Sequence, residues 1–389
     1  MLKKISVGID VGTYQIKVII TELVKQSDGK RIPKIIGKGL FKSNGLRHGY
    51  IINKNEVTSS IFQAIKEAEE QAGIKVKKAF ISIGGISLEG IHIKNKTIIT
   101  RVDNEITQID LDNISTENEK NPLLLNKKII STIPIEYKID NKRVFGDPVG
   151  MKGNKLELQA LYVTCLEQHL YDLIQSIEDL DIEIEDIHAS PIAGSFVTLT
   201  KTQKIAGCVL ANLGAETVSI IVFENNIPIS LEVFPTGSTD ITNNIALELK
   251  IPLNEAEKIK HGIVTSTIYP RKKLEEIVES QLDVIFKLIE AHLKKINRNA
   301  LLPAGIIISG GGSGITTIKD LAEVSLNIPS RIANINFVSG SNNIVQDSTW
   351  AVSYGLCLMG LTINQDVERK NFIKTLLNQV KKWITQFFV

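Results

Sequence analysis

Short runs of β-branched and apolar residues dominate the hydrophobic pattern of this chain, and they predict strands. Two such runs occupy residues 4–23, KISVGIDVGTYQIKVIITEL, and the turn at 12–14 predicts a hairpin. A second hairpin is predicted at 205–226, IAGCVLANLGAETVSIIVFENN. By contrast, apolar residues recur at steps of three and four along 55–73, NEVTSSIFQAIKEAEEQAG, which predicts a helix that ends at Gly73.

The two hairpins follow one plan. Placing Asp10 over Asn212 also places Gly12 over Gly214, so a strand–turn–strand unit recurs about 200 residues later in the chain. This recurrence predicts two similar halves. Consecutive backbone N–H groups in such turns form concave sites for anions, above all phosphate, and glycine lets a ligand approach the backbone closely. Taken alone, either segment could be an ordinary hairpin.

A third glycine-rich stretch, LLPAGIIISGGGSGITTIKDLAEV at 301–324, predicts a strand, a turn and an amphipathic helix. The turn contains Gly310, Gly311 and Gly312, and three glycines in a row can pass beneath a flat purine or ribose. The alternative is a flexible loop.

Composition narrows the class of protein. The 389 residues are 43% apolar and 23% charged, and 45 basic against 43 acidic residues give a net charge of +2. This balance speaks against a nucleic-acid partner. Cys165, Cys208 and Cys357 each lie in an apolar run and are predicted to be buried, reduced thiols. The start of the chain predicts no signal peptide, and no apolar run is long enough to span a bilayer.

The three motifs, in the order of a hairpin, a second hairpin and a strand–glycine–helix unit, resemble those of one ATPase superfamily. This superfamily contains actin, sugar kinases and heat-shock chaperones. The resemblance implies an α/β fold of the actin-like (ribonuclease H-like) type, with two lobes that hold ATP and Mg²⁺ between them. It implies that Asp10 lies near the Mg²⁺ through water. The implied nucleotide contacts are Asp10, Gly12, Thr13, Tyr14 and Lys17 in the first turn, Asn212, Gly214, Ala215, Glu216 and Thr217 in the second, and Gly237, Gly310, Gly311 and Gly312 elsewhere.

Longer stretches resemble one family within this superfamily, the bacterial cell division protein FtsA. VFGDPVGMKGNKLELQALYVT (144–164) and FPTGSTDITNNIALELKIPLNEAEKIKHG (234–262) are the most specific. STIPIEYKIDN (131–141), KAFISIGGISLEGIHIKN (78–95) and STWAVSYGLCLMG (348–360) also fit. The resemblance covers nearly the whole chain and implies an inserted small α+β subdomain and a C-terminal amphipathic helix.

The expected domain organisation follows from this resemblance. It comprises a first α/β subdomain (1–82 and 164–192), an inserted small subdomain (83–163), a second α/β subdomain (193–238 and 300–361), an upper helical subdomain (239–299), a linker (362–370) and a terminal helix (371–389).

The segment EKIK (257–260) within the upper subdomain carries an E-x-x-K pattern. Asn254 can cap a helix that ends near Gly262, and Glu257 and Lys260 then share one face. On this face the two side chains could flank a ribose and adenine. A surface ion pair is the alternative.

Three residues depart from the family pattern in ways that bear on hydrolysis. Asn212 stands where relatives carry aspartate, Ala215 where they carry glycine, and Ser190 where they carry an acid. An amide holds metal-bound water more weakly than a carboxylate, and a serine orients an attacking water less well. We therefore expect ATP binding with weak or absent ATPase activity. Glu216 could repel a polyphosphate unless it points away from it or towards Mg²⁺.

The last nineteen residues, NFIKTLLNQVKKWITQFFV, are apolar on one helical face and basic on the other. As a helix they would measure roughly 28 Å and lie in the membrane interface, with lysines near anionic lipid. Docking on the protein's own core or on a partner helix is the alternative. The expected membrane contacts are Phe372, Ile373, Leu376, Leu377, Val380, Trp383, Ile384, Phe387 and Phe388.

The FtsA resemblance implies a peripheral protein on the cytoplasmic face of the cell membrane at the division site. Such a protein self-assembles into a filament and tethers the tubulin-like protein FtsZ, whose tail would dock on 239–299. Two rivals share the fold: an adaptor of pilus assembly similar to PilM, and a small-molecule kinase. The DPVGM motif and the amphipathic tail speak against the first, and the lack of a convincing catalytic aspartate speaks against the second.

Overall fold

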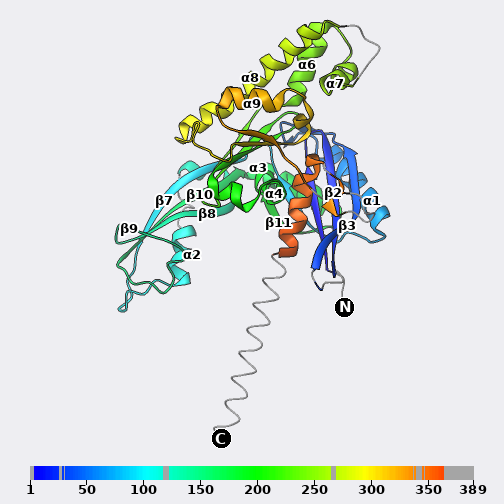
Figure 1. Ribbon diagram of the computed structural model, residues 1–389. Coiled ribbons are helices and arrows are strands. Elements are labelled where there is room, and N and C mark those ends of the chain that lie inside the picture. The colour runs from blue at the N-terminus through cyan, green and yellow to red at the C-terminus, as the bar shows by residue number, and fades with distance from the viewer. Residues whose placement is uncertain are drawn as a thin grey trace.

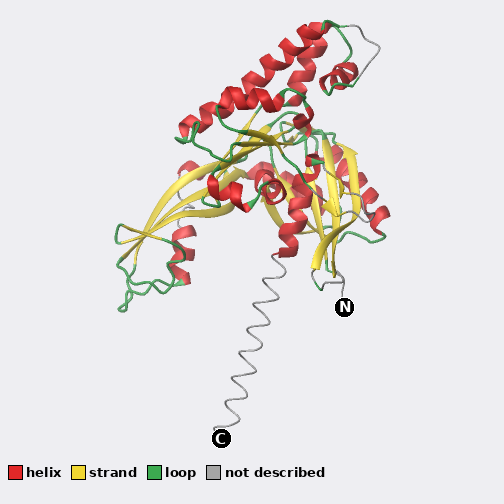
Figure 2. Ribbon diagram, in the orientation of Figure 1, coloured by secondary structure: helices red, strands yellow, loops and turns green. Residues whose placement is uncertain are grey.

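Three β-sheets of four or five strands, two smaller strand pairs and the helices packed around them make up the described part of the molecule (Figures 1 and 2). The computed structural model describes residues 4–25, 29, 31–116, 122–263, 269–335, 337–338, 344–345 and 347–362. The predicted membrane contacts at 372–388 lie outside these residues. None of the helices in the described ranges is both long enough and apolar enough to cross a membrane.

The first sheet has the strand order β11-β6-β1-β2-β3. Its strands are β1 (Ile5–Val11), β2 (Gln15–Lys25), β3 (Arg31–Lys42), β6 (Lys78–Ile83) and β11 (Glu183–Ala189). β1 to β3 form an antiparallel meander, while β6 runs parallel to β1 and β11 parallel to β6. The first predicted hairpin is therefore β1–β2, with its turn at 12–14.

Helix α1 (Lys54–Ala72) packs against β2 and β3. The Asn53 side chain accepts a hydrogen bond from the backbone N–H of Glu56 and caps the start. Gly73 ends the helix in the left-handed conformation, at φ 67°, which glycine adopts without strain. The helix predicted from the apolar periodicity is confirmed, with Ala72 as its last residue and Gly73 as its C-cap.

The second sheet, β14-β13-β12-β15-β16, repeats the first in order and direction. Its strands are β12 (Cys208–Leu213), β13 (Val218–Glu224), β14 (Ile227–Phe234), β15 (Ile306–Ser309) and β16 (Ser330–Ile332). β12, β13 and β14 take the places of β1, β2 and β3. The predicted duplication is therefore a duplication of the sheet as well as of the hairpin.

A four-stranded antiparallel sheet, β7-β10-β8-β9, forms the insert, which extends to the left in Figure 1. Its elements are β7 (Glu89–Ile98), α2 (Gln108–Thr116), the 3₁₀ turn η1 (Pro122–Leu124), β8 (Lys127–Ile139), β9 (Lys142–Val144) and β10 (Lys155–Leu166). β10 continues past the expected boundary at 163. Residues such as Ile106, Ile114 and Tyr162 give the insert its own apolar core.

One hydrophobic cluster joins the first sheet to one face of the second. It contains Ile9 and Ile81 from the first sheet, Val163 from the base of the insert, and Leu210 and Ile221 from the second sheet. Helix α4 (Ser190–Thr198) contacts strands of both sheets, whereas α3 (Glu167–Glu178) packs against α1 and β11, and α5 (Lys201–Ala206) packs against β13. The two halves therefore share a continuous apolar interior.

Helices cover the other face of the second sheet, at the top of Figure 1. They are α6 (Ser238–Leu249), α7 (Leu253–Lys260), α8 (Arg271–Lys295) and α9 (Ile318–Leu326). The prediction that Asn254 caps α7 is wrong. Pro252, whose fixed φ suits the residue at a helix start, precedes the first helical residue Leu253, and Asn254 already lies in the first turn.

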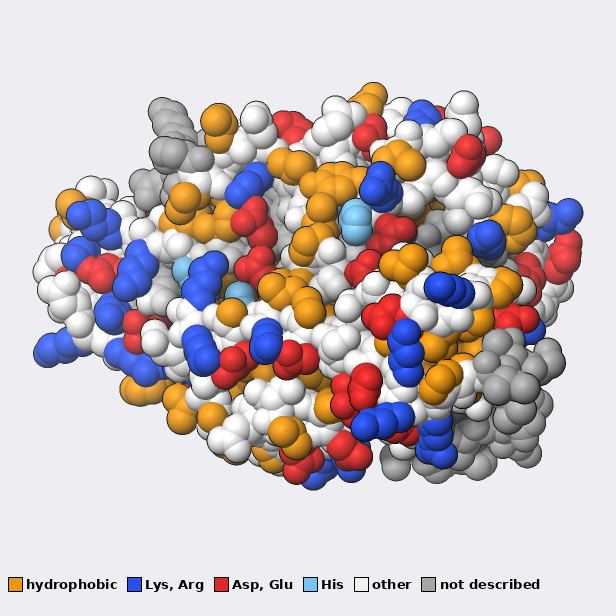
Figure 3. Space-filling model, turned by 90° about the horizontal axis from the view of Figure 1, so that it is seen from above, with side chains coloured by type: hydrophobic (Ala, Val, Ile, Leu, Met, Phe, Trp, Pro, Cys, Tyr) orange, Lys and Arg blue, Asp and Glu red, His pale blue; other side chains and the backbone are white. Residues whose placement is uncertain are grey.

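Shorter elements complete the described chain. They are the hairpin β4 (Leu46–Arg47) and β5 (Tyr50–Ile51), the 3₁₀ turns η2 (Gly311–Gly314) and η3 (Ser348–Trp350), the pair β17 (Phe337–Val338) and β18 (Ile344–Val345), and a helix at 351–362. The three cysteines are free and buried, as predicted, and burial raises the pKa of the Cys357 thiol to about 12. Seen from above, acidic and basic side chains intermingle on the surface (Figure 3).

Candidate functional site

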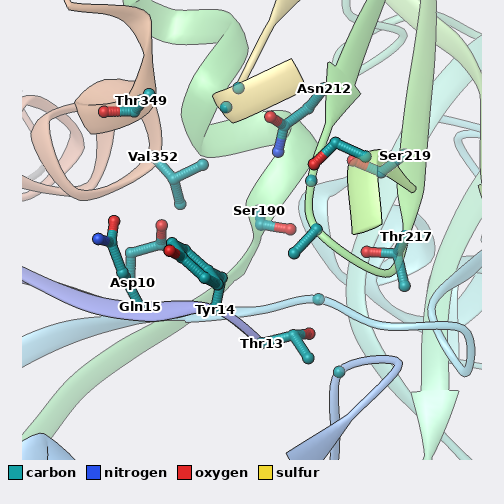
Figure 4. Close-up of a pocket in the computed structure, with 18 of the residues that line it drawn as sticks. Asp10, Thr13, Tyr14, Gln15, Ser190, Asn212, Thr217, Ser219, Thr349 and Val352 are labelled. Atoms are coloured by element: carbon teal, nitrogen blue, oxygen red, sulfur yellow. The ribbon is translucent and has the colours of Figure 1, made fainter. Parts of the chain in front are cut away.

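A cleft of about 240 Å³ lies between the two halves of the molecule. It is lined by residues at the ends of β1, β6 and β12, and at the starts of the segments that follow β11 and β15. The carboxyl ends of strands are where open α/β sheets bind ligands. In Figure 4, Asp10, Tyr14 and Gln15 gather on one side, Asn212, Thr217 and Ser219 gather on the other, and Ser190 lies between them.

The first hairpin places a partly buried carboxylate, that of Asp10 at the end of β1, in the cleft. Ser82 Oγ donates a hydrogen bond of 2.8 Å to Asp10 Oδ1, and Asp10 pairs across the hairpin with Lys17. Burial raises the pKa of Asp10, against the attraction of Lys17. Burial likewise lowers the pKa of Lys17, against the attraction of Asp10 and Asp347. Both groups therefore lose solvation that a charged ligand or cation in the cleft could replace.

The second turn presents mostly backbone and neutral side chains. The Gly214 N–H donates to the Thr217 carbonyl at 2.9 Å and closes the turn. The carbonyls of Gly214 and Ala215 accept hydrogen bonds from the first residues of α6, at 2.9 and 2.8 Å. Gly237, just before α6, must lack a side chain because a Cβ would lie 2.2 Å from the Ala215 carbonyl oxygen.

The third glycine motif packs against the second turn. Gly310 has φ 86°, and a Cβ there would lie 2.3 Å from Asn212 Oδ1. A Cβ on Gly312 would lie 2.9 Å from the Leu213 Cβ, so this glycine is needed for packing beneath the cleft. Gly311 faces open space and lines the cleft.

Helix α7 contributes a hydrogen-bonded charged group. Glu257 lines the cleft, and its Oε2 accepts from Lys260 Nζ at 2.7 Å and from the Thr242 hydroxyl. His261 Nε2 lies 3.3 Å from Glu257 Oε1. Hydrogen bonds from His261, Lys260 and Thr242 outweigh burial and lower the pKa of Glu257 to about 2. Glu257 is thereby held as a carboxylate.

Most of the residues expected at the site meet in this cleft, and four do not. Lining residues among those expected are Asp10, Gly12, Thr13, Tyr14, Lys17, Asn212, Gly214, Ala215, Thr217, Glu257, Gly310 and Gly311. Gly237 and Gly312 support the second turn from behind. Lys260 differs from the expected ribose contact because its side chain is only 1% exposed and donates to Glu257 and α6. Glu216 contacts the first half instead, through His48.

Several lining residues were not singled out from the sequence. They are Val11, Gln15, Gly49, Ser82, Gly84, Gly85, Ser238, Thr239, His261, Ser348, Thr349 and Val352. Gly84 and Gly85 directly follow β6, so a strand ending in two glycines was a usable signal. No local sequence pattern marks Thr349 or Val352. They belong to a later segment of the chain that reaches the cleft only in the folded molecule.

The donor set suits magnesium held through water. Asp10 supplies one partly buried carboxylate, and Asn212 supplies an amide on the other side. Among the residues that the structure describes, no group of three or more histidines, cysteines and acidic residues could hold a metal ion. Mg²⁺ ordinarily keeps several waters and takes one or two carboxylates plus substrate phosphates. The residues present fit that mode of binding.

Two family models match the chain. The model for "Cell division protein FtsA" matches residues 209–355, which contain the second turn, α6 to α9 and the third glycine motif. The model for the SHS2 domain inserted in FtsA matches residues 89–164, the four-stranded insert. The chain belongs to the FtsA family.

Relatives within the FtsA family cover almost the whole chain. The cell division protein FtsA of Pseudomonas aeruginosa is 27% identical over 384 residues, which cover 93% of this chain and 91% of that protein. FtsA of Bacillus subtilis is 26% identical, over 90% of this chain and 82% of its own length. The family is therefore matched over both halves and the insert.

Solved structures of other proteins share the actin-like fold. The PilM–PilN type IV pilus biogenesis complex contains a chain that is 15% identical, with a TM-score of 0.67, covering 91% of this chain and 98% of that one. MreB 5 of Spiroplasma citri bound to AMPPNP is 10% identical, with a TM-score of 0.55, covering 94% and 99%. These likenesses concern the fold alone. They do not favour a PilM-like adaptor as the function of this chain.

Proposed function

We propose that this FtsA-family protein binds ATP with Mg²⁺ in the cleft between its halves. The observation that carries the proposal is the pair of equivalent turns, 12–14 and 214–217, which face one another across the cleft with the glycines of η2 beside them. Asp10 would hold Mg²⁺ through water, and the backbone N–H groups of both turns would bind the phosphates. Calorimetric titration of the full chain tests this, and no heat of binding from ATP with Mg²⁺ would refute it.

Hydrolysis of the bound ATP is proposed to be weak or absent. Ser190 begins α4 and lies in the middle of the cleft, where it offers a hydroxyl and no carboxylate to an attacking water. Asn212 offers an amide for the same task on the other side. Nucleotide then acts by its binding energy, which stabilises the closed arrangement of the two halves. Rapid phosphate release in a single-turnover experiment would contradict this.

A membrane adaptor is the proposed role in the cell. The protein would self-assemble, bind the tail of FtsZ on the helices of 239–299, and anchor to anionic lipid at the division site through residues 371–389. The sequence of that last segment supports the anchor, because its polar face carries lysines and no acidic residue. One molecule would bind reversibly, and a filament would bind more firmly by multivalency.

Sedimentation with vesicles tests the anchor. Full-length protein is expected to pellet with vesicles that contain anionic phosphatidylglycerol, and a version that ends at Lys370 is expected to stay in the supernatant. Vesicles of neutral phosphatidylcholine serve as the control for charge. Equal pelleting of both versions would refute the anchor without affecting the proposal for ATP.

A further inference from the structure

A contact between His48 and Glu216 spans the two halves of the molecule. Glu216 belongs to the second turn, and His48 lies 168 positions earlier, in the turn of the β4–β5 hairpin of the first half. The backbone N–H of His48 donates a hydrogen bond of 2.6 Å to Glu216 Oε2. His48 Nδ1 lies 3.0 Å from the Glu216 carbonyl oxygen. One residue of the first half therefore holds both the side chain and the backbone of Glu216.

The backbone around His48 is shaped for this contact. His48 has φ 48°, which is uncommon for a residue other than glycine, and Gly49 follows with φ 84°. The chain is pressed against the loop after β6, where a Cβ on Gly49 would lie 2.2 Å from Gly85 Cα. The Ile86 N–H donates to the His48 carbonyl at 3.2 Å. An unfavourable conformation that neighbouring segments fix in this way marks a constrained, functional position.

The contact decides what the second turn presents to the cleft. Ala215 and Thr217 line the cleft, whereas Glu216 between them does not. Glu216 carries the only acidic side chain within 212–219, the segment opposite Asp10. A carboxylate turned into the cleft would repel a polyphosphate strongly, because charges interact over several ångströms in a partly buried site. The turn can offer its backbone N–H groups to phosphate only if this carboxylate is kept aside.

We infer that His48 is a positioning residue for phosphate binding: it holds Glu216 against the first half so that the second turn faces the nucleotide with neutral groups. This inference rests on the proposed ATP site. It predicts that releasing the Glu216 carboxylate weakens nucleotide binding, and that this loss of affinity grows with the number of phosphates on the nucleotide. The reason is that the carboxylate repels phosphate and does not act on the base. The same contact also joins the two halves. Closing the cleft and orienting the second turn therefore occur together.

The variant His48→Gly tests the inference with little added strain. Glycine adopts the positive φ at position 48 readily and keeps the backbone N–H that binds the Glu216 carboxylate, but it lacks the imidazole ring that contacts the Glu216 carbonyl. Without the ring the second turn loses one of its two attachments to the first half, and the more flexible glycine no longer fixes the direction of this N–H. Calorimetric titration of the full chain with ATP and with AMP, each with Mg²⁺, measures the dependence on phosphate. We expect His48→Gly to weaken ATP binding about tenfold or more and AMP binding less than about twofold. Retained AMP binding also shows that the variant is folded.

A second substitution separates charge from loosened structure. Glu216→Gln keeps an acceptor for the His48 N–H and removes the negative charge. In the double variant His48→Gly/Glu216→Gln, ATP affinity is expected to return to within about threefold of Glu216→Gln alone. A turn that was merely loosened would not be rescued, so absent rescue overturns the inference. An equal loss for ATP and AMP, or no loss for either, overturns it as well.

The outcome for the unmodified protein keeps the two proposals apart. If it binds neither nucleotide, the proposed ATP site fails and the inference fails with it. If it binds ATP tightly and His48→Gly binds ATP equally tightly, only the role of His48 is overturned.

Discussion

Replacing Lys260 by methionine should loosen the junction of α6 and α7. Lys260 Nζ donates to the Ser238 carbonyl at 3.1 Å, to Thr242 Oγ1 at 2.9 Å and to Glu257 Oε2 at 2.7 Å. Methionine fills a similar volume and supplies no donor. The three acceptors then lose their shared partner, and one of them is a carboxylate that lines the cleft.

The expected cost is about 2–3 kcal/mol. Removing one partner of a fully buried ion pair typically costs about 3–5 kcal/mol. The Lys260 side chain is 1% exposed, but the Glu257 side chain is 40% exposed, so water can solvate the carboxylate that remains. This lowers the estimate towards the ordinary cost of about 1–3 kcal/mol for an unsatisfied buried polar group.

Hydrogen exchange followed by mass spectrometry is the appropriate assay, because a chain with several subdomains need not unfold in one step. Amides of α6 and α7 in Lys260→Met should exchange roughly thirtyfold to more than a hundredfold faster, while those of α1 should be unchanged. Glu257→Gln is the matched control, because it keeps the acceptor and removes the charge. Unchanged exchange in α6 and α7 would show that Lys260 contributes no net stability there.

The same variant changes the response to pH. The folded pKa of Glu257 is lowered from 4.5 to about 2, so its contribution to stability is present above pH 4.5 and is lost as pH falls towards 2. Without Lys260 the pKa of Glu257 should rise. Acid-induced loosening of α7 is then expected to begin at a higher pH in Lys260→Met than in the unmodified protein, and titration of the exchange rates measures this.

Four further substitutions address the cleft. Gly310→Ala should destabilise the protein by about 1–3 kcal/mol in thermal unfolding, because φ is 86° and the new Cβ would lie 2.3 Å from Asn212 Oδ1. Gly311→Ala, which faces open space, should be nearly neutral, and equal effects would refute the packing argument. Asp10→Asn should remove the dependence of ATP affinity on Mg²⁺, measured by calorimetry with magnesium and with EDTA; a retained dependence would exclude Asp10 as the metal-facing group. Asn212→Asp should raise the single-turnover rate of ATP hydrolysis by about tenfold or more, and an unchanged rate would show that the amide does not limit turnover.

Local patterns were sufficient to predict the elements around the site. The strands of both hairpins follow from β-branched residues on either side of a glycine turn, and α1 follows from its periodicity and Gly73. The third motif was predicted for the same reason, since glycines between an apolar strand and an amphipathic helix are a signal within one short window. Contacts inside such windows depend on few other residues.

Side-chain directions across elements were not predictable in this way. Whether Lys260 faces the cleft or α6 depends on the rotation of α7 about its axis, which the start at Leu253 and the packing on α6 decide together. The partner of Glu216 lies 168 positions away in the other half. A sequence shows that Glu216 is an acid in a turn, but only the assembled halves bring His48 to it.

The insert has a mechanical consequence for the whole molecule. It is joined covalently to the first half, yet β7 and β8 pack against β14 of the second half. At Gly90 the approach is so close that a Cβ would lie 3.0 Å from backbone atoms of Leu231. If the second half moved relative to the first, this packing would move the insert with it. Opening at the cleft would be transmitted to the far tip of the insert, where a neighbouring molecule could sense it.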